Sequence, residues 1–130
     1  MLSARGAYTL KRAEADRKAI LIATGSEVAL AVDVAKALEA EGIGADVVSM
    51  PCTELFDEQP ESYRADILPG GALRVSIEAG TTFGWERYTG MDGVRIGLDR
   101  FGASAPAEDL FPHFGFSVDA IVSKILEKIG

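Results

Sequence analysis

The stretch from residue 19 to residue 50 constrains the fold more than any other part of this sequence. It begins with the apolar run AILIA at residues 19–23 and ends with the largely apolar run ADVVSM at residues 45–50. Both runs are short and bounded by turn residues, as buried strands are. Between them, residues 27–41 carry apolar side chains at helical spacing, with Asp33, Lys36 and Glu39 on another face. Strand, helix and strand in this order form a βαβ unit, so we expect two parallel strands joined by a right-handed crossover.

The rest of the chain is expected to pack on that unit as a three-layer α/β domain. Further strands are predicted at residues 6–10, 73–77 and 94–98, and further helices at residues 53–57, 60–68, 83–88 and 107–111. Ser117 is the predicted cap of a last, amphipathic helix. The charged residues 11–18 make a short turn into the strand at Ala19. Because a short turn between adjacent strands favours antiparallel pairing, residues 6–10 are placed at an edge of the sheet.

Length and charge narrow the classes of function. A chain of 130 residues is long enough for one domain with a real core. Its 13 basic and 20 acidic residues give a net charge of −7, which argues against binding to nucleic acid or to an anionic membrane. No apolar stretch approaches the roughly 20 residues of a membrane span, and residues 1–5 lack the apolar region of an export signal. The single cysteine, Cys52, excludes an internal disulfide framework, so we expect a cytoplasmic protein.

The corner Thr24-Gly25-Ser26 is the most suggestive local feature for chemistry. It follows a strand and opens a helix, and free main-chain N–H groups at such a corner can hold a phosphate or carboxylate. The alternative is a capped helix start with no ligand, with Thr24 and Glu27 forming a capping box. The glycine patterns of dinucleotide-binding and phosphate-binding loops are absent, so nucleotide binding is not supported.

A second candidate site comprises Glu78, Thr81 and Thr82, which follow the predicted strand at residues 73–77. Ligands of open α/β sheets bind at the carboxyl ends of the strands, so these polar residues are well placed for a site. The alternative is a polar corner that lies at an interface or in water.

Three further features favour packing over chemistry. His113, the only histidine, lies among phenylalanines with no visible nucleophile, orienting carboxylate or second metal ligand, so a packing or interface role is favoured. Cys52 is more typical of a small buried residue than of a nucleophile. Phe83, Trp85 and Tyr88 could stack on a ligand, although such clusters more often pack a core or an interface. The residues alone therefore predict a soluble α/β domain without a convincing catalytic set.

Several motifs, in order along the chain, resemble the C-terminal domain of transketolase. Residues 22–28 read IATGSEV and residues 47–53 read VVSMPCT, followed by Phe56-Asp57, Tyr63-Arg64, DRFGASAP at residues 99–106, and Leu110, Phe111, Phe114, Gly115 and Phe116. The resemblance extends from about Arg5 to the end of the chain. It favours transketolase over the related domains of pyruvate dehydrogenase and deoxyxylulose phosphate synthase.

This resemblance implies a single α/β/α domain at residues 1–130, with a five-stranded, mostly parallel sheet and one antiparallel edge strand. It implies a homodimeric parent enzyme that moves a two-carbon ketol unit between sugar phosphates of the pentose phosphate pathway, using thiamine diphosphate and a divalent metal such as Mg²⁺. In this family the N-terminal and middle domains hold the cofactor and its activating glutamate, and neither has a counterpart here. No catalytic or cofactor-binding residue is therefore carried over, and His113 does not correspond to an active-site histidine of the family.

Three functions remain open from the sequence. The chain is expected to be a transketolase C-terminal domain with a structural or docking role that is inactive by itself. It is alternatively a regulatory module that binds a small anion at Thr24, Gly25 and Ser26, or a subunit that docks on separate chains carrying the other two domains. Whether it is an excised piece or a separate coding unit is not decided by the residues.

Overall fold

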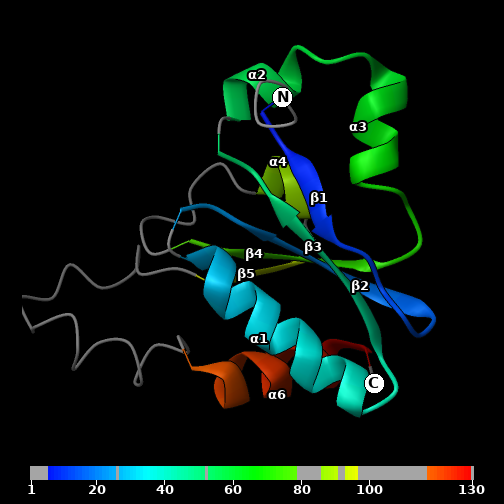
Figure 1. Ribbon diagram of the computed structural model, residues 1–130, viewed down its shortest axis with the longest axis vertical. Helices are drawn as coiled ribbons and strands as arrows, with labels where there is room; N and C mark the ends of the chain where they lie inside the picture. The colour runs from blue at the N-terminus through cyan, green and yellow to red at the C-terminus, as the bar shows by residue number, and fades with distance from the viewer. Residues whose placement is uncertain are drawn as a thin grey trace, which may run out of the picture.

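A mixed sheet of five strands runs through the middle of the molecule in the computed structural model, which describes residues 6–25, 27–51, 53–78, 86–90, 93–96 and 117–129 (Figure 1). The strands are β1 (Tyr8–Lys11), β2 (Arg17–Ala23), β3 (Gly44–Ser49), β4 (Leu73–Ile77) and β5 (Val94–Ile96). Their order across the sheet is β1-β3-β2-β4-β5. The predicted α/β class is therefore confirmed.

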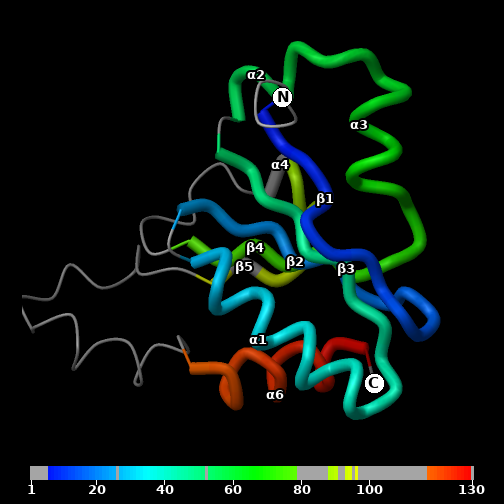
Figure 2. The backbone as a smooth tube through the Cα atoms, in the orientation of Figure 1, coloured from blue at the N-terminus to red at the C-terminus, as the bar shows by residue number. Residues whose placement is uncertain are grey.

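Helices cover both faces of this sheet. The helices are α1 (Glu27–Ala40), α2 (Thr53–Asp57), α3 (Glu61–Ile67), α4 (Glu86–Thr89) and α6 (Val118–Ile129). The longer pair, α1 and α6, lies on one face, and the short helices α2, α3 and α4 lie on the other (Figures 1 and 2). None of the helices within the described ranges is long and apolar enough to cross a membrane.

Strand β2 is buried on both faces because its side chains alternate between two hydrophobic layers. On one face of the sheet, β2 contributes Ala19, Leu21 and Ala23 to a layer with side chains of α1 and α6. The α6 side chains in this layer include Ile121 and Ile125. Ile20 and Ile22 point to the other face, where they pack with residues of α2, α3 and α4. A strand that is apolar at consecutive positions is typical of a central parallel strand covered by helices on both sides.

The predicted βαβ unit is confirmed, since β2 and β3 pair in parallel across α1. Strands β4 and β5 extend the parallel set on the other side of β2. Residues 8–11 form an antiparallel edge strand, as expected. The expectation that this strand pairs with β2, the next strand in the sequence, was wrong, because β1 pairs with β3. Strand β2 has no free edge, because β3 and β4 already occupy both of its hydrogen-bonding sides.

Most predicted bounds differ from the structure by a few residues. Strand β2 begins at Arg17, and the predicted helix at residues 83–88 is described only as α4, Glu86–Thr89. Ser117 caps α6 as predicted, because its Oγ accepts a hydrogen bond of 3.2 Å from the N–H of Ala120. The predicted helix at residues 107–111 lies outside the described residues.

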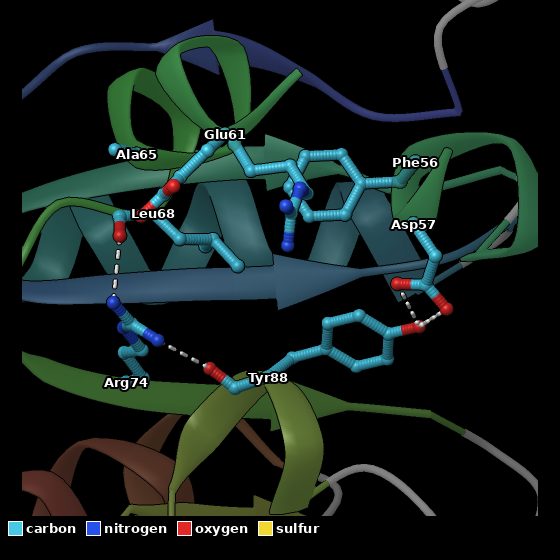
Figure 3. A pocket seen from close by; sticks show the side chains of 8 residues that line it. Phe56, Asp57, Glu61, Ala65, Leu68, Arg74 and Tyr88 are labelled. Atoms are coloured by element: carbon cyan, nitrogen blue, oxygen red, sulfur yellow. Dashed lines mark hydrogen bonds between the residues drawn. The ribbon is translucent and has the colours of Figure 1, made fainter. Parts of the chain in front are cut away.

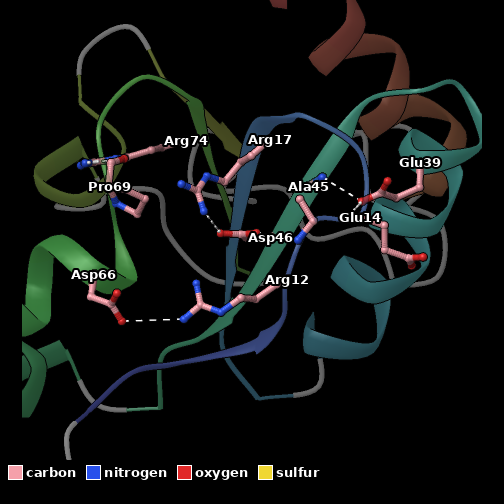
Figure 4. Close-up of polar contacts among 10 residues, drawn as sticks. Arg12, Glu14, Arg17, Glu39, Ala45, Asp46, Asp66, Pro69 and Arg74 are labelled. Atoms are coloured by element: carbon pink, nitrogen blue, oxygen red, sulfur yellow. Dashed lines mark hydrogen bonds and ion pairs between the residues drawn. The ribbon is translucent and has the colours of Figure 1, made fainter.

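A carboxylate network holds the amino edge of the sheet (Figure 4). The Glu39 side chain, near the end of α1, accepts hydrogen bonds from the N–H groups of Glu14 (2.9 Å), Ala15 (3.0 Å) and Ala45 (3.2 Å). The hydrogen bond from Glu14 has the largest effect on the pKa of Glu39 and lowers it. The other two bonds also lower this pKa, whereas desolvation raises it. Buried Asp46 accepts in the same way from the N–H of Ala13 (2.7 Å) and from Arg17 Nη1 (3.0 Å).

Candidate functional site

The carboxyl edge of the sheet brings together two segments that the sequence analysis treated separately. Thr24 and Gly25 follow β2, and Glu78 follows β4; the two strands are parallel neighbours that end in register at Ala23 and Ile77. The Thr24 hydroxyl donates a hydrogen bond to the Glu78 carboxylate. The N–H of Glu78 is itself fixed, because it donates to the carbonyl of Ile96 at the end of β5 (3.0 Å).

The corner at Thr24 has the geometry of a tight helix start. The carbonyl of Thr24 accepts from the N–H of Glu27 (3.1 Å), and that of Gly25 accepts from the N–H of Val28 (3.3 Å). Gly25 has a positive φ of 54°, a conformation that glycine adopts at little cost. The carboxylate of Glu78 therefore lies beside the start of α1, where the helix dipole favours a negative charge. An anion added at this corner would lie close to that carboxylate. Ser26, Thr81 and Thr82 lie outside the described residues, so anion binding at this corner stays a prediction.

Strand β4 presents a polar row to the face covered by the short helices. Val75 and Ile77 point into the layer with α1 and α6, so Arg74, Ser76 and Glu78 alternate to the opposite face. The Ser76 residue is 1% exposed, and its hydroxyl has no hydrogen-bond partner among the described residues.

A cavity of about 460 Å³ lies on this same face, between α2, α3, α4 and β4 (Figure 3). Its walls carry four charged side chains, Asp57, Glu61, Arg64 and Arg74, and two aromatic rings, Phe56 and Tyr88. This volume lies within the ~300–1,000 Å³ that is typical of small-molecule pockets.

Arg74 fixes one wall of the cavity. Its Nη2 donates to the carbonyl of Leu68 (2.6 Å) at the end of α3 and, more weakly, to that of Pro69 (3.4 Å). Its Nη1 donates to the carbonyl of Tyr88 (3.0 Å) in α4. Burial lowers the pKa of Arg74, as expected for a guanidinium that is partly removed from water.

Tyr88 fixes the adjacent part of the wall (Figure 3). Its hydroxyl donates to the Asp57 carboxylate, with both oxygens at 3.1 Å, and its ring lies 6.3 Å from that of Phe56 at 58°. Such a tilted pair is a favourable aromatic arrangement. The aromatic cluster predicted from the sequence is thus described only at Tyr88, which packs in the core, while Phe83, Trp85, His113 and Cys52 lie outside the described residues.

The sequence analysis did not identify Arg74 as part of a site. The available signal was its position as a charged residue between two apolar residues of a predicted strand. Its hydrogen-bond partners are carbonyls at the ends of two helices, and the spacing of residues in the sequence does not show where those carbonyls lie. Within the residues that the structure describes, no three His, Cys, Asp or Glu side chains form a group that could hold a metal ion.

A mostly parallel sheet with helices on both faces and polar side chains at its carboxyl edge defines a doubly wound α/β domain. The model of the transketolase-like TK C-terminal domain matches residues 6–117. The chain belongs to this family.

The chain spans about a fifth of the length of the curated transketolases that it matches. It is 51% identical over 126 residues to a transketolase of Sinorhizobium medicae, and the match covers 96% of this chain but 18% of that protein. A solved transketolase from Leishmania mexicana superposes with a TM-score of 0.84 at 46% identity, covering 96% of this chain and 18% of that one. A split-gene transketolase described as an inactive β4 tetramer shares the fold, with a TM-score of 0.72 at 21% identity over 95% of this chain and 42% of the other.

Proposed function

We propose that this chain acts as the C-terminal docking domain of a transketolase, the enzyme that transfers a two-carbon ketol unit between sugar phosphates in the pentose phosphate pathway. One observation carries the proposal: the chain matches a transketolase at 51% identity while it spans 18% of that protein's length. The chemistry is then supplied by parts of the enzyme that correspond to the other four-fifths of the relative.

The parent enzyme is proposed to use thiamine diphosphate and Mg²⁺, both held by its other domains. The described residues do not fit such a cofactor, because they offer no three-ligand group for a metal ion, and the Glu78 carboxylate at the strand ends already accepts from Thr24. No step of the reaction is therefore assigned to this chain. Its proposed role is to complete a homodimeric, cytoplasmic enzyme by packing against the other domains, without binding to nucleic acid or membranes.

The test separates catalysis from docking. Purified chain is titrated with thiamine diphosphate and Mg²⁺ in a calorimeter and assayed on xylulose 5-phosphate and ribose 5-phosphate; we expect neither saturable heat nor turnover. A protein that comprises only the N-terminal and middle domains of a homologous transketolase is then mixed with the chain. We expect co-elution in gel filtration and a gain in activity that depends on chain concentration. Turnover by the chain alone, or no co-elution at any ratio, would contradict the proposal.

A second candidate is a separate subunit of a split transketolase. The solved split-gene transketolase supports it, because a chain with this fold exists there as part of a divided enzyme. The reading frame around the gene decides between the two: one continuous frame for all three domains favours the first candidate, and an adjacent frame for the missing domains favours the second.

A third candidate is a regulatory module that takes a small anion at Thr24, Gly25 and Ser26. If it is correct, phosphate raises the melting temperature of the wild-type chain and Ser26→Ala weakens that effect. Identical melting curves of the wild type with and without phosphate would eliminate it.

A further inference from the structure

Arg64 brings an oriented guanidinium group to the cavity between α2, α3, α4 and β4. Its Nε donates to the carbonyl of Gln59 (3.0 Å), in the connection between α2 and α3, and this bond fixes the direction of the group. Among the described residues, its terminal nitrogens Nη1 and Nη2 have no acceptor. A guanidinium presents these two nitrogens as a planar fork, so Arg64 can donate two parallel hydrogen bonds to one anion.

The contacts of the other charged side chains determine where an anion can approach. Asp57 accepts from the Tyr88 hydroxyl, and Arg74 donates to the main-chain carbonyl of the same tyrosine. Asp57 and Arg74 therefore lie at opposite ends of Tyr88 (Figure 3). Glu61 is exposed in the first turn of α3. The cavity thus offers the fork of Arg64 to a ligand, while Arg74 adds a positive charge that its main-chain acceptors do not neutralise.

The charges on the walls favour an anion that carries a single charge. Two guanidinium groups and two carboxylates line the cavity, so their formal charges cancel. A ligand with one negative charge is attracted by Arg64 and Arg74, whereas a second charge would add repulsion from Asp57 and Glu61. A carboxylate carries one charge, and its two oxygens match the two parallel N–H groups of an arginine fork.

The apolar walls indicate what the carboxylate is attached to. Phe56, Leu68 and Tyr88 are buried side chains that line the same cavity, so they can contact the carbon atoms of a ligand. We propose that this cavity binds a small monocarboxylate with an apolar body, and that Arg64 holds the carboxylate group. The site does not depend on the proposed function.

The experiment is an NMR titration of the ¹⁵N-labelled chain, at constant ionic strength, with three probes: benzoate, benzyl alcohol and inorganic phosphate. We expect saturable amide shifts with benzoate, centred on residues 56–68 and Tyr88. Benzyl alcohol keeps the ring and lacks the charge, so it should bind at least about tenfold more weakly. Inorganic phosphate should also bind more weakly than benzoate, because it has no apolar body and carries about −1.5 charges or more near neutral pH.

Variants assign the contact to the proposed arginine. Arg64→Gln should weaken the affinity for benzoate by about tenfold or more, the effect expected for loss of hydrogen bonds to a charged group. Arg64→Lys should have an intermediate affinity, since it keeps the charge and loses the fork. Arg12→Gln, which removes an exposed arginine outside the cavity, should bind as the wild type does. Because Arg64 is exposed, its variants should fold, and a wild-type amide spectrum verifies this.

Four results would overturn the proposal. The first is the absence of saturable shifts with benzoate at millimolar concentrations. The second is an Arg64→Gln variant that binds benzoate as well as the wild type does, or no worse than Arg12→Gln. The third is inorganic phosphate binding at the same residues at least as tightly as benzoate, which would show that charge alone selects the ligand. The fourth is a set of shifts confined to residues 24–28, which moves the anion to the start of α1.

Discussion

Single side chains at two positions join separate elements of the fold. Arg74 links β4 to the ends of α3 and α4 through hydrogen bonds to the carbonyls of Leu68 and Tyr88. Thr24 and Glu78 link the ends of β2 and β4. The bond between Thr24 and Glu78, which are 54 positions apart, could not be predicted from the sequence because it depends on which strands become neighbours. The bonds of Arg74, to carbonyls 6 and 14 positions away, depend on where two helices end.

Replacement of Arg74 by Met tests the first link. The substitution keeps most of the apolar stem and removes the donors, so the hydrogen bonds from Arg74 to the carbonyls of Leu68 and Tyr88 are lost. We expect the free energy of unfolding to fall by about 1–3 kcal/mol, the cost of leaving buried polar groups unsatisfied. Urea denaturation measures it. Arg12→Met is the control, since exposed ion pairs contribute only about 0–1 kcal/mol; equal losses for the two variants would refute the capping role of Arg74.

A double-mutant cycle of Thr24→Val and Glu78→Ala tests the second link. The threonine-to-valine change removes the donor at nearly constant volume. If the hydrogen bond stabilises the corner, the two substitutions should couple by about 0.5–1.5 kcal/mol. Additive losses in urea denaturation would show that the contact contributes nothing to stability.

At the scale of elements, the main chains of two segments approach closely at the amino edge of the sheet. Gly44, the first residue of β3, donates from its N–H to the carbonyl of Asp16 (2.9 Å). A Cβ atom at this position would overlap with the main-chain carbonyls of Ala15 and Asp16. The connection between β1 and β2 therefore lies directly against the start of β3.

Gly44→Ala should consequently destabilise the chain by about 1–3 kcal/mol, the usual cost of overpacking. Gly70→Ala is the matched control, because a Cβ there meets no atom within 4 Å and its φ is not positive. Thermal melts of both variants provide the measurement. A Gly44→Ala variant as stable as Gly70→Ala would mean that the connection moves away without cost.

Glu39 makes the same edge sensitive to acid. Its pKa in the folded chain lies below the ordinary value of 4.5, because the charged form accepts three main-chain hydrogen bonds. Its contribution to stability is therefore fully present above pH 4.5 and is lost as the pH falls through the lowered folded-state pKa. Urea denaturation between pH 7 and pH 3 should show a smaller acid-induced loss for Glu39→Gln than for the wild type. The control, Glu41→Gln, should keep the wild-type slope; parallel slopes for all three proteins would contradict the assignment.

Local sequence signals predicted the elements well and their neighbours less well. The strand at residues 73–77 and the Ser117 cap were correct because alternation and capping act within a few residues. The pairing of β1 was wrong because a short connection says nothing about which edge of the sheet is free. Thr24 and Glu78 were both recognised as polar residues at strand ends, but their contact depends on the strand order β3-β2-β4, which local signals do not predict. The cavity was not predicted because three helices from separate segments form it.

At the scale of the whole molecule, the two hydrophobic layers are unequal. Among the described residues, the layer with α1 and α6 contains most of the buried aliphatic side chains, whereas short helices cover the other layer and leave a cavity. Stability should therefore depend most on the layer that the last helix closes.

Ile125→Ala and Ile129→Ala test this dependence within α6. Ile125 is fully buried and Ile129 is 37% exposed. The first substitution should cost about 2–5 kcal/mol in urea denaturation, the range for large-to-alanine changes in a core, and the second should cost much less. Similar losses at both positions would indicate that α6 is not held against the sheet.

The strand order also determines how the chain must fold. Among the described strands, no two paired neighbours are joined by a tight hairpin; each pairing spans at least one helix or another strand. Such distant contacts give a high contact order and slow folding. During synthesis, β2 cannot complete its pairing until β4 has left the ribosome, and the larger layer stays open until α6 has emerged. A nascent chain therefore exposes apolar side chains of its central strand until these later elements have emerged, and chaperones can bind them during that interval.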